Sequence, residues 1–196
     1  MNILTDVLPE SVTITNTEYL VNTDFRACLN IILAFEDPEL TPQEKQVILL
    51  SMLFVTAPPV TQEMYERAMW FLNGGHEDES DVVPMRLYSF AKDANFVYAA
   101  FKQTHGVDLQ KDNLHWWQFL ALFMDLGQDT TFCQLTALRK RLKTGKASKE
   151  EKEAAREMPE LIDVPDVDDR TLQEKEIAVE FERKVLEAQK RRNGNS

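Results

Sequence analysis

The chain has 196 residues, of which 43% are hydrophobic, so it is long enough and apolar enough to bury a core. Its 22 basic and 33 acidic side chains give a net charge of −11, which disfavours a phosphate backbone or an anionic membrane surface as a partner. We therefore expect no nucleic-acid and no membrane partner. Two cysteines make no disulfide framework, and the first residues lack a signal-peptide pattern, so we expect a reducing, cytoplasmic setting.

The first part of the chain predicts a small β-hairpin followed by a helix. Ser11–Ile14 and Glu18–Val21 are short β-prone runs, and Asn16 lies between them. The run Asn22-Thr23-Asp24 then offers helix caps for a first helix that extends to about Phe35. The apolar residues of its predicted inner face are spaced three and four apart: Phe25, Cys28, Leu29 and Ile32.

Two further helices are predicted from their caps. Thr41 is followed by proline and then by Glu44, which is a capping-box start for a second helix that reaches about Val55. Because this helix is nearly all apolar, we expect it to be buried. Thr61 caps a third helix, and the Asn-Gly-Gly run at 73–75 closes it.

A fourth, amphipathic helix is predicted from about Pro84 to His105, with Gly106 as its terminator. Asp93 falls on the polar side of this predicted helix. Trp70 and Phe96 lie off the main apolar faces of their helices, which hints at self-association.

The segment Leu114–Leu126 predicts a helix at the centre of the fold. Ten of its thirteen residues are apolar and none is proline or glycine, so other elements must surround it. At this length it is too short to cross a bilayer, which needs about 20 residues. We expect it to begin near Asp112, with Trp116 and Trp117 in the core and His115 hydrogen-bonded at the edge of the core.

The composition changes after Gly145. We predict a compact, mainly α-helical domain over residues 1–145, with about six helices and the N-terminal hairpin, and a charged linker and C-terminal helix over 146–196. Ser148 opens a short charged helix by the capping-box rule, and 157–169 is typical of a linker. The last predicted helix carries the apolar stripe Ile177, Phe181 and Val185. We expect either this stripe or a groove beside the fourth helix to bind a partner, and an ordinary packed terminal helix is the open alternative for the stripe.

No motif in the sequence carries catalytic chemistry. The histidines have no i, i+4 pairing, no cluster has metal-ligand spacing, and neither a nucleophile elbow nor a glycine-rich phosphate loop is present. The acidic loop 77–81 lacks the ligand alternation of a calcium site. We therefore expect no enzymatic activity, no cofactor and no metal. The basic run Arg139–Lys143 reads as a solvated helix end or as a partner of the acidic tail, with nucleic-acid binding as the weaker alternative.

Three stretches together carry a resemblance to a known family. The most specific is Leu114-His115-Trp116-Trp117, which is followed by Phe119, Phe123, Leu126, Phe132 and Arg139. The others are Asn22–Arg26 after the hairpin, and Asp93-Ala94 with Val97-Tyr98-Ala99-Ala100-Phe101. Over residues 1–145 the chain resembles the tailed-bacteriophage gp-fifteen family, small proteins encoded among tail-morphogenesis genes near the tape-measure gene. The part after Gly145 lies outside this resemblance.

The resemblance implies a non-enzymatic phage tail-assembly protein in the host cytoplasm. More specifically, it implies a tail-assembly chaperone that binds and solubilises the tape-measure protein before the tail tube polymerises. Other tail proteins and a second copy of the chain are further partners that we expect. The alternative is a structural virion subunit, such as a tail-completion or head-tail connector protein, which would stay in the finished particle.

Overall fold

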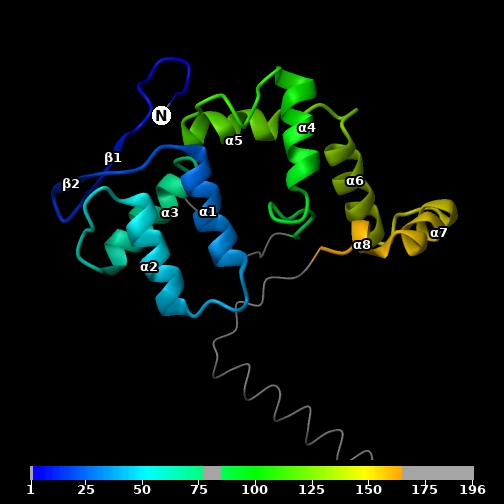
Figure 1. Cartoon of the computed structure of the whole chain (residues 1–196), viewed down its shortest axis with the longest axis horizontal. Helices are drawn as coiled ribbons and strands as arrows, with labels where there is room; N and C mark the ends of the chain where they lie inside the picture. The colour runs from blue at the N-terminus through cyan, green and yellow to red at the C-terminus, as the bar shows by residue number, and fades with distance from the viewer. Residues whose placement is uncertain (1, 77–84, 165–196) are drawn as a thin grey trace, which may run out of the picture.

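The computed structural model describes residues 2–76 and 85–164. In these ranges the chain is mainly α-helical, with eight helices and a two-stranded antiparallel hairpin (Figure 1), which confirms the predicted fold class. In chain order the elements are β1 (Ser11–Ile14), β2 (Thr17–Leu20), α1 (Phe25–Glu36), α2 (Pro42–Leu53), α3 (Gln62–Leu72), α4 (Ala94–His105), α5 (Trp116–Met124), α6 (Thr131–Lys143), α7 (Lys149–Glu157) and α8 (Pro159–Ile162).

The hairpin turns through two residues with positive φ, Thr15 at 48° and Asn16 at 61°, the geometry that matches the twist of two antiparallel strands. A lone hairpin is marginal in water, so it must pack on something. Its inward residues Val12 and Ile14 are buried, and the Glu63 carboxylate of α3 accepts hydrogen bonds from Thr15 N–H and Oγ1 at 3.0 and 3.1 Å. The hairpin is thereby fixed to the start of α3.

Helices α1 and α2 begin as the sequence predicts but differ in how they are buried. Asp24 caps α1, and Thr41 and Glu44 form the predicted capping box of α2. The expectation that α2 is buried as a whole is wrong, because only Leu49 and Leu53 are fully covered and Val47 is 63% exposed. The helix packs on α1 with one face, and its outward positions Gln43, Val47 and Ser51 are exposed.

Helix α4 begins at Ala94, so the predicted start near Pro84 is wrong for the residues described from 85 onward. The Asp93 carboxylate accepts from Ser89 N–H at 3.1 Å, and the Leu87 carbonyl accepts from a side chain of α6 at 3.1 Å instead of from a helical N–H. Both bonds occupy the residues before α4, where the one helical backbone bond is from Asp93 N–H to the Ser89 carbonyl at 2.8 Å. The predicted terminator is confirmed: Gly106 has φ of 71° and ends α4.

Helix α5 lies between two groups of elements, with the hairpin and α1 to α3 on one side and α4 and α6 to α8 on the other (Figure 1). The ring of Phe119 stacks on Phe25 of α1 at 5.1 Å and on Phe101 of α4 at 4.9 Å between centroids. Phe119 is completely buried, so its ring joins both groups. The helix is shorter than predicted, starting at Trp116, and Met124 near its end is 84% exposed.

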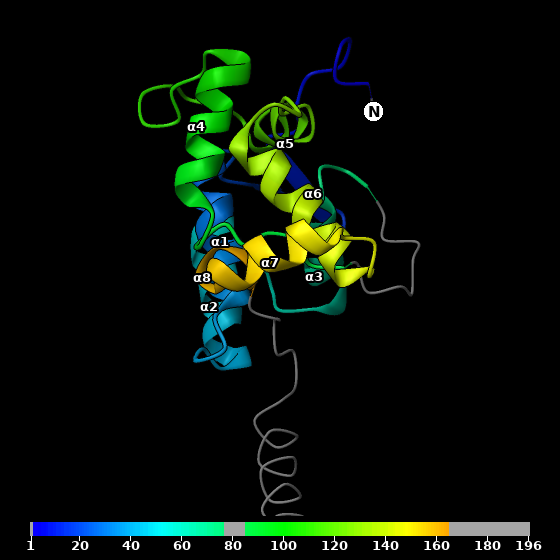
Figure 2. The same cartoon turned by 90° about the vertical axis from the view of Figure 1, so that its right-hand side faces the viewer.

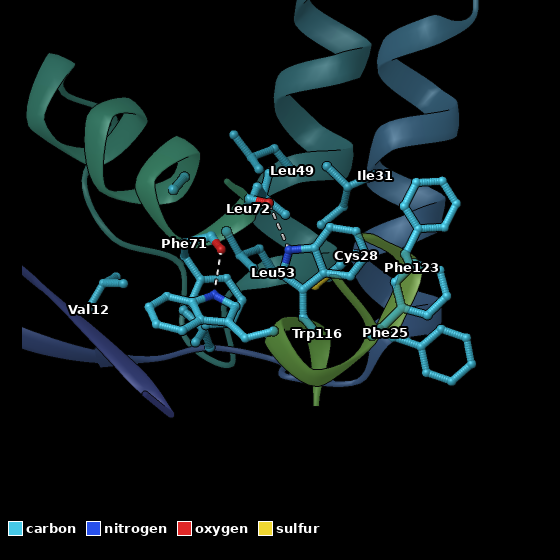
Figure 3. Packing of buried hydrophobic residues seen from close by; sticks show 14 of the residues in the cluster. Val12, Phe25, Cys28, Ile31, Leu49, Leu53, Phe71, Leu72, Trp116 and Phe123 are labelled. Atoms are coloured by element: carbon cyan, nitrogen blue, oxygen red, sulfur yellow. Dashed lines mark hydrogen bonds between the residues drawn. The ribbon is translucent and has the colours of Figure 1, made fainter. Parts of the chain in front are cut away.

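The junction of α3 and α5 depends on two indole groups (Figure 3). Trp116 Nε1–H donates to the Leu72 carbonyl and Trp117 Nε1–H to the Phe71 carbonyl, each at 2.8 Å. These acceptors belong to the last turn of α3, where a helix leaves carbonyls without internal partners. Both tryptophans are buried, which confirms their predicted place in the core.

Candidate partner-binding groove

An open groove of about 700 Å³ lies between α6 and α7. Its lining combines short or apolar side chains with polar ones: Gln128, Cys133, Gln134, Ala137, Leu138, Arg141, Glu151 and Ala154. An apolar floor with a few polar groups is typical of sites that receive a side chain or a helix of a partner. The groove lies on α6 and α7, whereas the sequence predicted the partner contact beside α4 or on the C-terminal stripe.

The groove exists because α6 has two different faces. Phe132, Leu135 and Arg139 are buried toward the core. The groove residues Cys133, Ala137 and Arg141 follow one another at i, i+4 spacing, and at 100° per residue they lie on roughly the opposite side of the helix. One side of α6 therefore completes the core while the other stays open.

Helix α7 forms the second wall and is held by its own cap. Figure 2 shows the chain turning back after α6 into α7 and α8. Ser148 and Glu151 form the predicted capping box, and the Arg141 guanidinium donates to Glu151 Oε1 at 2.7 and 3.0 Å. The hydrogen bond from Arg141, and next the one from Ser148 N–H, lower the pKa of the Glu151 carboxyl. Because both side chains are partly exposed, we expect this pair to add little stability.

Behind the groove lies a buried ion pair that the sequence analysis missed. Arg139 Nη1 and Nη2 donate to the two Asp93 oxygens at 2.7 and 2.9 Å, and each side chain is only 1% exposed. The remaining donors reach the carbonyls of Leu87, Leu161 and Ile162 at 3.1, 2.6 and 3.1 Å. All five N–H groups of the guanidinium thus have acceptors.

The ion pair corrects two expectations. Asp93 is buried and does not lie on a polar helix face, and Arg139 is not part of a solvated helix end. One signal could have indicated the burial of Arg139, because it follows Phe132 by seven residues and Leu135 by four and so belongs to the apolar stripe of α6.

The same contacts fix the position at which the described chain ends. Arg139 holds the carbonyls of Leu161 and Ile162, and Lys92 Nζ donates to the Asp163 carbonyl. Val164 is buried. The short helix α8 falls inside the stretch 157–169 that the sequence suggested to be a linker, and its bonds to Arg139 cross the predicted domain boundary at residue 145. The position of that boundary itself stays a prediction.

His115 is hydrogen-bonded at the edge of the core, as expected. Its Nδ1 accepts from Trp117 N–H at 3.0 Å, which makes it the N-cap of α5, and Gln118 completes a capping box. Since Nδ1 is an acceptor, a neutral ring carries its proton on Nε2, which lies 3.0 Å from the Pro9 carbonyl. The imidazole therefore ties the segment before the hairpin to the start of α5.

The remaining expectations concern a metal site, a membrane-spanning helix and self-association. Among residues 2–76 and 85–164, no three or more His, Cys, Asp or Glu side chains are placed to hold a metal ion. In the same residues no helix has the length and apolarity needed to cross a membrane. Trp70 and Phe96, which hinted at self-association, are partly buried against the core. The loop 77–81 and the predicted partner-binding residues Ile177, Phe181 and Val185 lie outside the described residues.

The family model described as Bacteriophage Gp15 protein matches residues 4–164. The match runs past residue 145 and takes in α7, α8 and both walls of the groove, so it is longer than the resemblance noted in the sequence. Neither a curated protein nor a solved structure matches the chain. The chain belongs to the bacteriophage Gp15 family. It is thus a phage structural or tail-related protein, from a family not known for enzymatic activity.

Proposed function

We propose that this chain is a tail-assembly chaperone, which binds the phage tape-measure protein in the host cytoplasm and keeps it soluble until the tail tube polymerises. The observation that carries the proposal is the match to the Gp15 family over residues 4–164. The open groove between α6 and α7 supports it, because a chaperone for a helical client needs an apolar surface that the client can occupy.

The partner we infer is a long helical chain with an apolar stripe. The groove offers Ala137, Leu138 and Ala154 to apolar side chains, while Gln134 and the Arg141–Glu151 pair are available to the polar residues beside them. The apolar residues Ile177, Phe181 and Val185 form the second contact surface of the proposal.

Each of these contacts buries a small interface, as a chaperone that must be released requires. A chaperone must leave when tail-tube subunits arrive, so each copy has to bind reversibly. Many copies along one client supply the total strength through avidity, and contacts between neighbouring copies would add to it.

Co-expression with the tape-measure protein of the same phage tests the proposal. We expect affinity capture and size-exclusion chromatography to give a soluble complex with several copies of this chain per client. Ala137→Glu places a charge in the groove and should reduce capture about tenfold, which corresponds to 1.4 kcal/mol. Asn95→Glu adds the same charge on exposed α4 and should leave capture unchanged.

The alternative role as a structural virion subunit gives the opposite outcome. Mass spectrometry of purified virions would then find the chain in stoichiometric amounts, and the free tape-measure protein would not be captured. That combination of results would replace the chaperone proposal by the tail-completion or connector role.

A further inference from the structure

The floor of the α6/α7 groove is made of short side chains. Cys133, Ala137 and Ala154 leave room that larger apolar side chains can fill. The two alanines and the cysteine also let the backbone of an incoming helix approach closely. What covers this surface in the free chain can be argued from the residues that follow Val164.

The chain after Val164 is long enough to pass around one helix before the last predicted helix begins. Seven residue steps separate the anchored Val164 from Thr171, where the sequence predicts the last helix to begin. Extended chain spans about 3.3 to 3.6 Å per residue, so this connection can bridge roughly 23 to 25 Å. To reach the groove the connection has to pass around α6 or α7, and a helix is about 10 Å across. The connection is therefore more than twice as long as the diameter of the helix.

Charge favours the same placement. The connection and the docking segment together, residues 165–188, contain eight acidic and four basic side chains. The end of α6 beside the groove is basic, with Lys140 and Arg141 in its last turn and the exposed Lys146 shortly after it. Opposite charges that face one another guide docking and set its direction, even where each pair adds little affinity.

We propose that the segment 171–188 of this chain docks into its own α6/α7 groove, with Phe181 and its apolar neighbours Ile177 and Val185 against the floor. The two surfaces assigned to client binding then cover one another in the free protein. A client would have to displace the segment, which releases both surfaces together. The docking itself needs no client, so its test is separate from that of the proposed function.

Cys133 provides the probe, because it lines the groove and is only partly buried, with its thiol 3.4 Å from the Leu126 carbonyl. We expect a filled groove to make this thiol less accessible. The other cysteine, Cys28, is completely buried. We expect Phe181→Ser in the full chain to raise the rate of Cys133 alkylation by a maleimide about tenfold, with the labelled site assigned by peptide mass spectrometry. Ending the chain at residue 164 should have the same effect, and adding a peptide of residues 165–196 should restore protection.

Arg183→Ser is the matched control. On a helix Arg183 lies about 200° from Phe181, so it faces away from the groove and the alkylation rate should not change. Equal rates for the unaltered chain and for Phe181→Ser would overturn the proposal. So would protection that disappears on dilution, because the groove would then be filled by a second copy.

Discussion

The guanidinium of Arg139 joins three segments that are far apart in sequence: the residues before α4, α6 itself, and the end of α8. Removing two charges from water costs several kcal/mol, and a bidentate pair with every donor satisfied recovers most of that cost. Removing one partner of such a pair strongly destabilises the fold, because the other charge stays buried without a counter-charge. The contribution of Arg139 is therefore better tested by breaking the pair than by counting its bonds.

Replacing Arg139 by Met should lower the free energy of unfolding by about 3 to 5 kcal/mol, since Asp93 and three carbonyls lose their donor. Urea unfolding followed by circular dichroism measures this loss. Arg141→Met, two residues further along α6, removes only a partly exposed pair and should cost at most about 1 kcal/mol. Adding Asp93→Leu to Arg139→Met should recover part of the loss. Equal effects of the two single variants would contradict a structural role for the buried pair.

The buried Cys28 thiol should make the stability of the protein depend on pH. Burial, and next the charge of Asp24, raise the pKa of the Cys28 thiol from its ordinary 9.0 to about 12. The folded state therefore keeps this proton at pH values where the unfolded chain loses it, and stability falls as the pH rises from about 9 toward 12. We expect the urea midpoint to drop between pH 8 and pH 10. A Cys28→Ala variant, less stable at both pH values, should show a smaller drop, and an equal drop would contradict this assignment.

At the scale of elements, the close approach of α3 and α5 requires glycine after α3. Gly75 has φ of +82°, and a Cβ placed on it would lie 2.6 Å from the ring of Trp117. Gly106 after α4 has a similar φ of +71° but open space around it. Alanine at Gly106 therefore costs only the free energy of backbone strain, whereas alanine at Gly75 adds a steric clash with Trp117.

Gly106→Ala should destabilise the protein by about 1 to 2 kcal/mol, the cost of a left-handed residue with a side chain. Gly75→Ala should cost about 1 to 3 kcal/mol more, because the Trp117 ring must also move. Thermal unfolding of both variants measures the difference. If the two substitutions had the same effect, the indole would not be held rigidly against the α3 terminus.

Element starts could be predicted wherever a side chain of the sequence itself supplies the cap. Thr41 with Glu44, Thr61, and Ser148 with Glu151 are local signals, and each helix begins where they indicate. The start of α4 could not be predicted in this way, because no local cap marks it. The residues before it bond to Arg139, which is 46 residues from Asp93 and 52 from Leu87, as well as to one another through Ser89 and Asp93.

On the scale of the whole molecule, the groove could not be read from the sequence. Its lining residues on α6 look like an ordinary second face, and they become a groove only because α7 folds back beside them. The core could be predicted better, because the apolar run around Phe119 has to be buried. The stripe at Ile177, Phe181 and Val185 is a sequence pattern whose role is a proposal.

Truncation tests whether residues 146–164 belong with the helices before them. A chain that ends at residue 164 should lose only the free energy of docking the C-terminal segment, about 1.4 kcal/mol for a tenfold protection, since every described contact remains. A chain that ends at residue 145 loses two acceptors of Arg139 and the buried Ala155 and Val164, and should lose about 2 to 4 kcal/mol. Equal stability of both truncated chains, measured by urea titration, would instead support a unit boundary at 145.

The α3–α5 junction also has an optical consequence. All three indole rings of the chain lie there, with Trp70 and Trp117 edge to face at 5.3 Å and Trp116 beside them on α5. Intrinsic fluorescence therefore reports the separation of α3 from α5 and little else, whereas far-ultraviolet dichroism averages over every helix. Coincident midpoints for the two signals would show that the helix groups on either side of α5 unfold as one unit. An earlier fluorescence midpoint would show that the α1–α3 group detaches first.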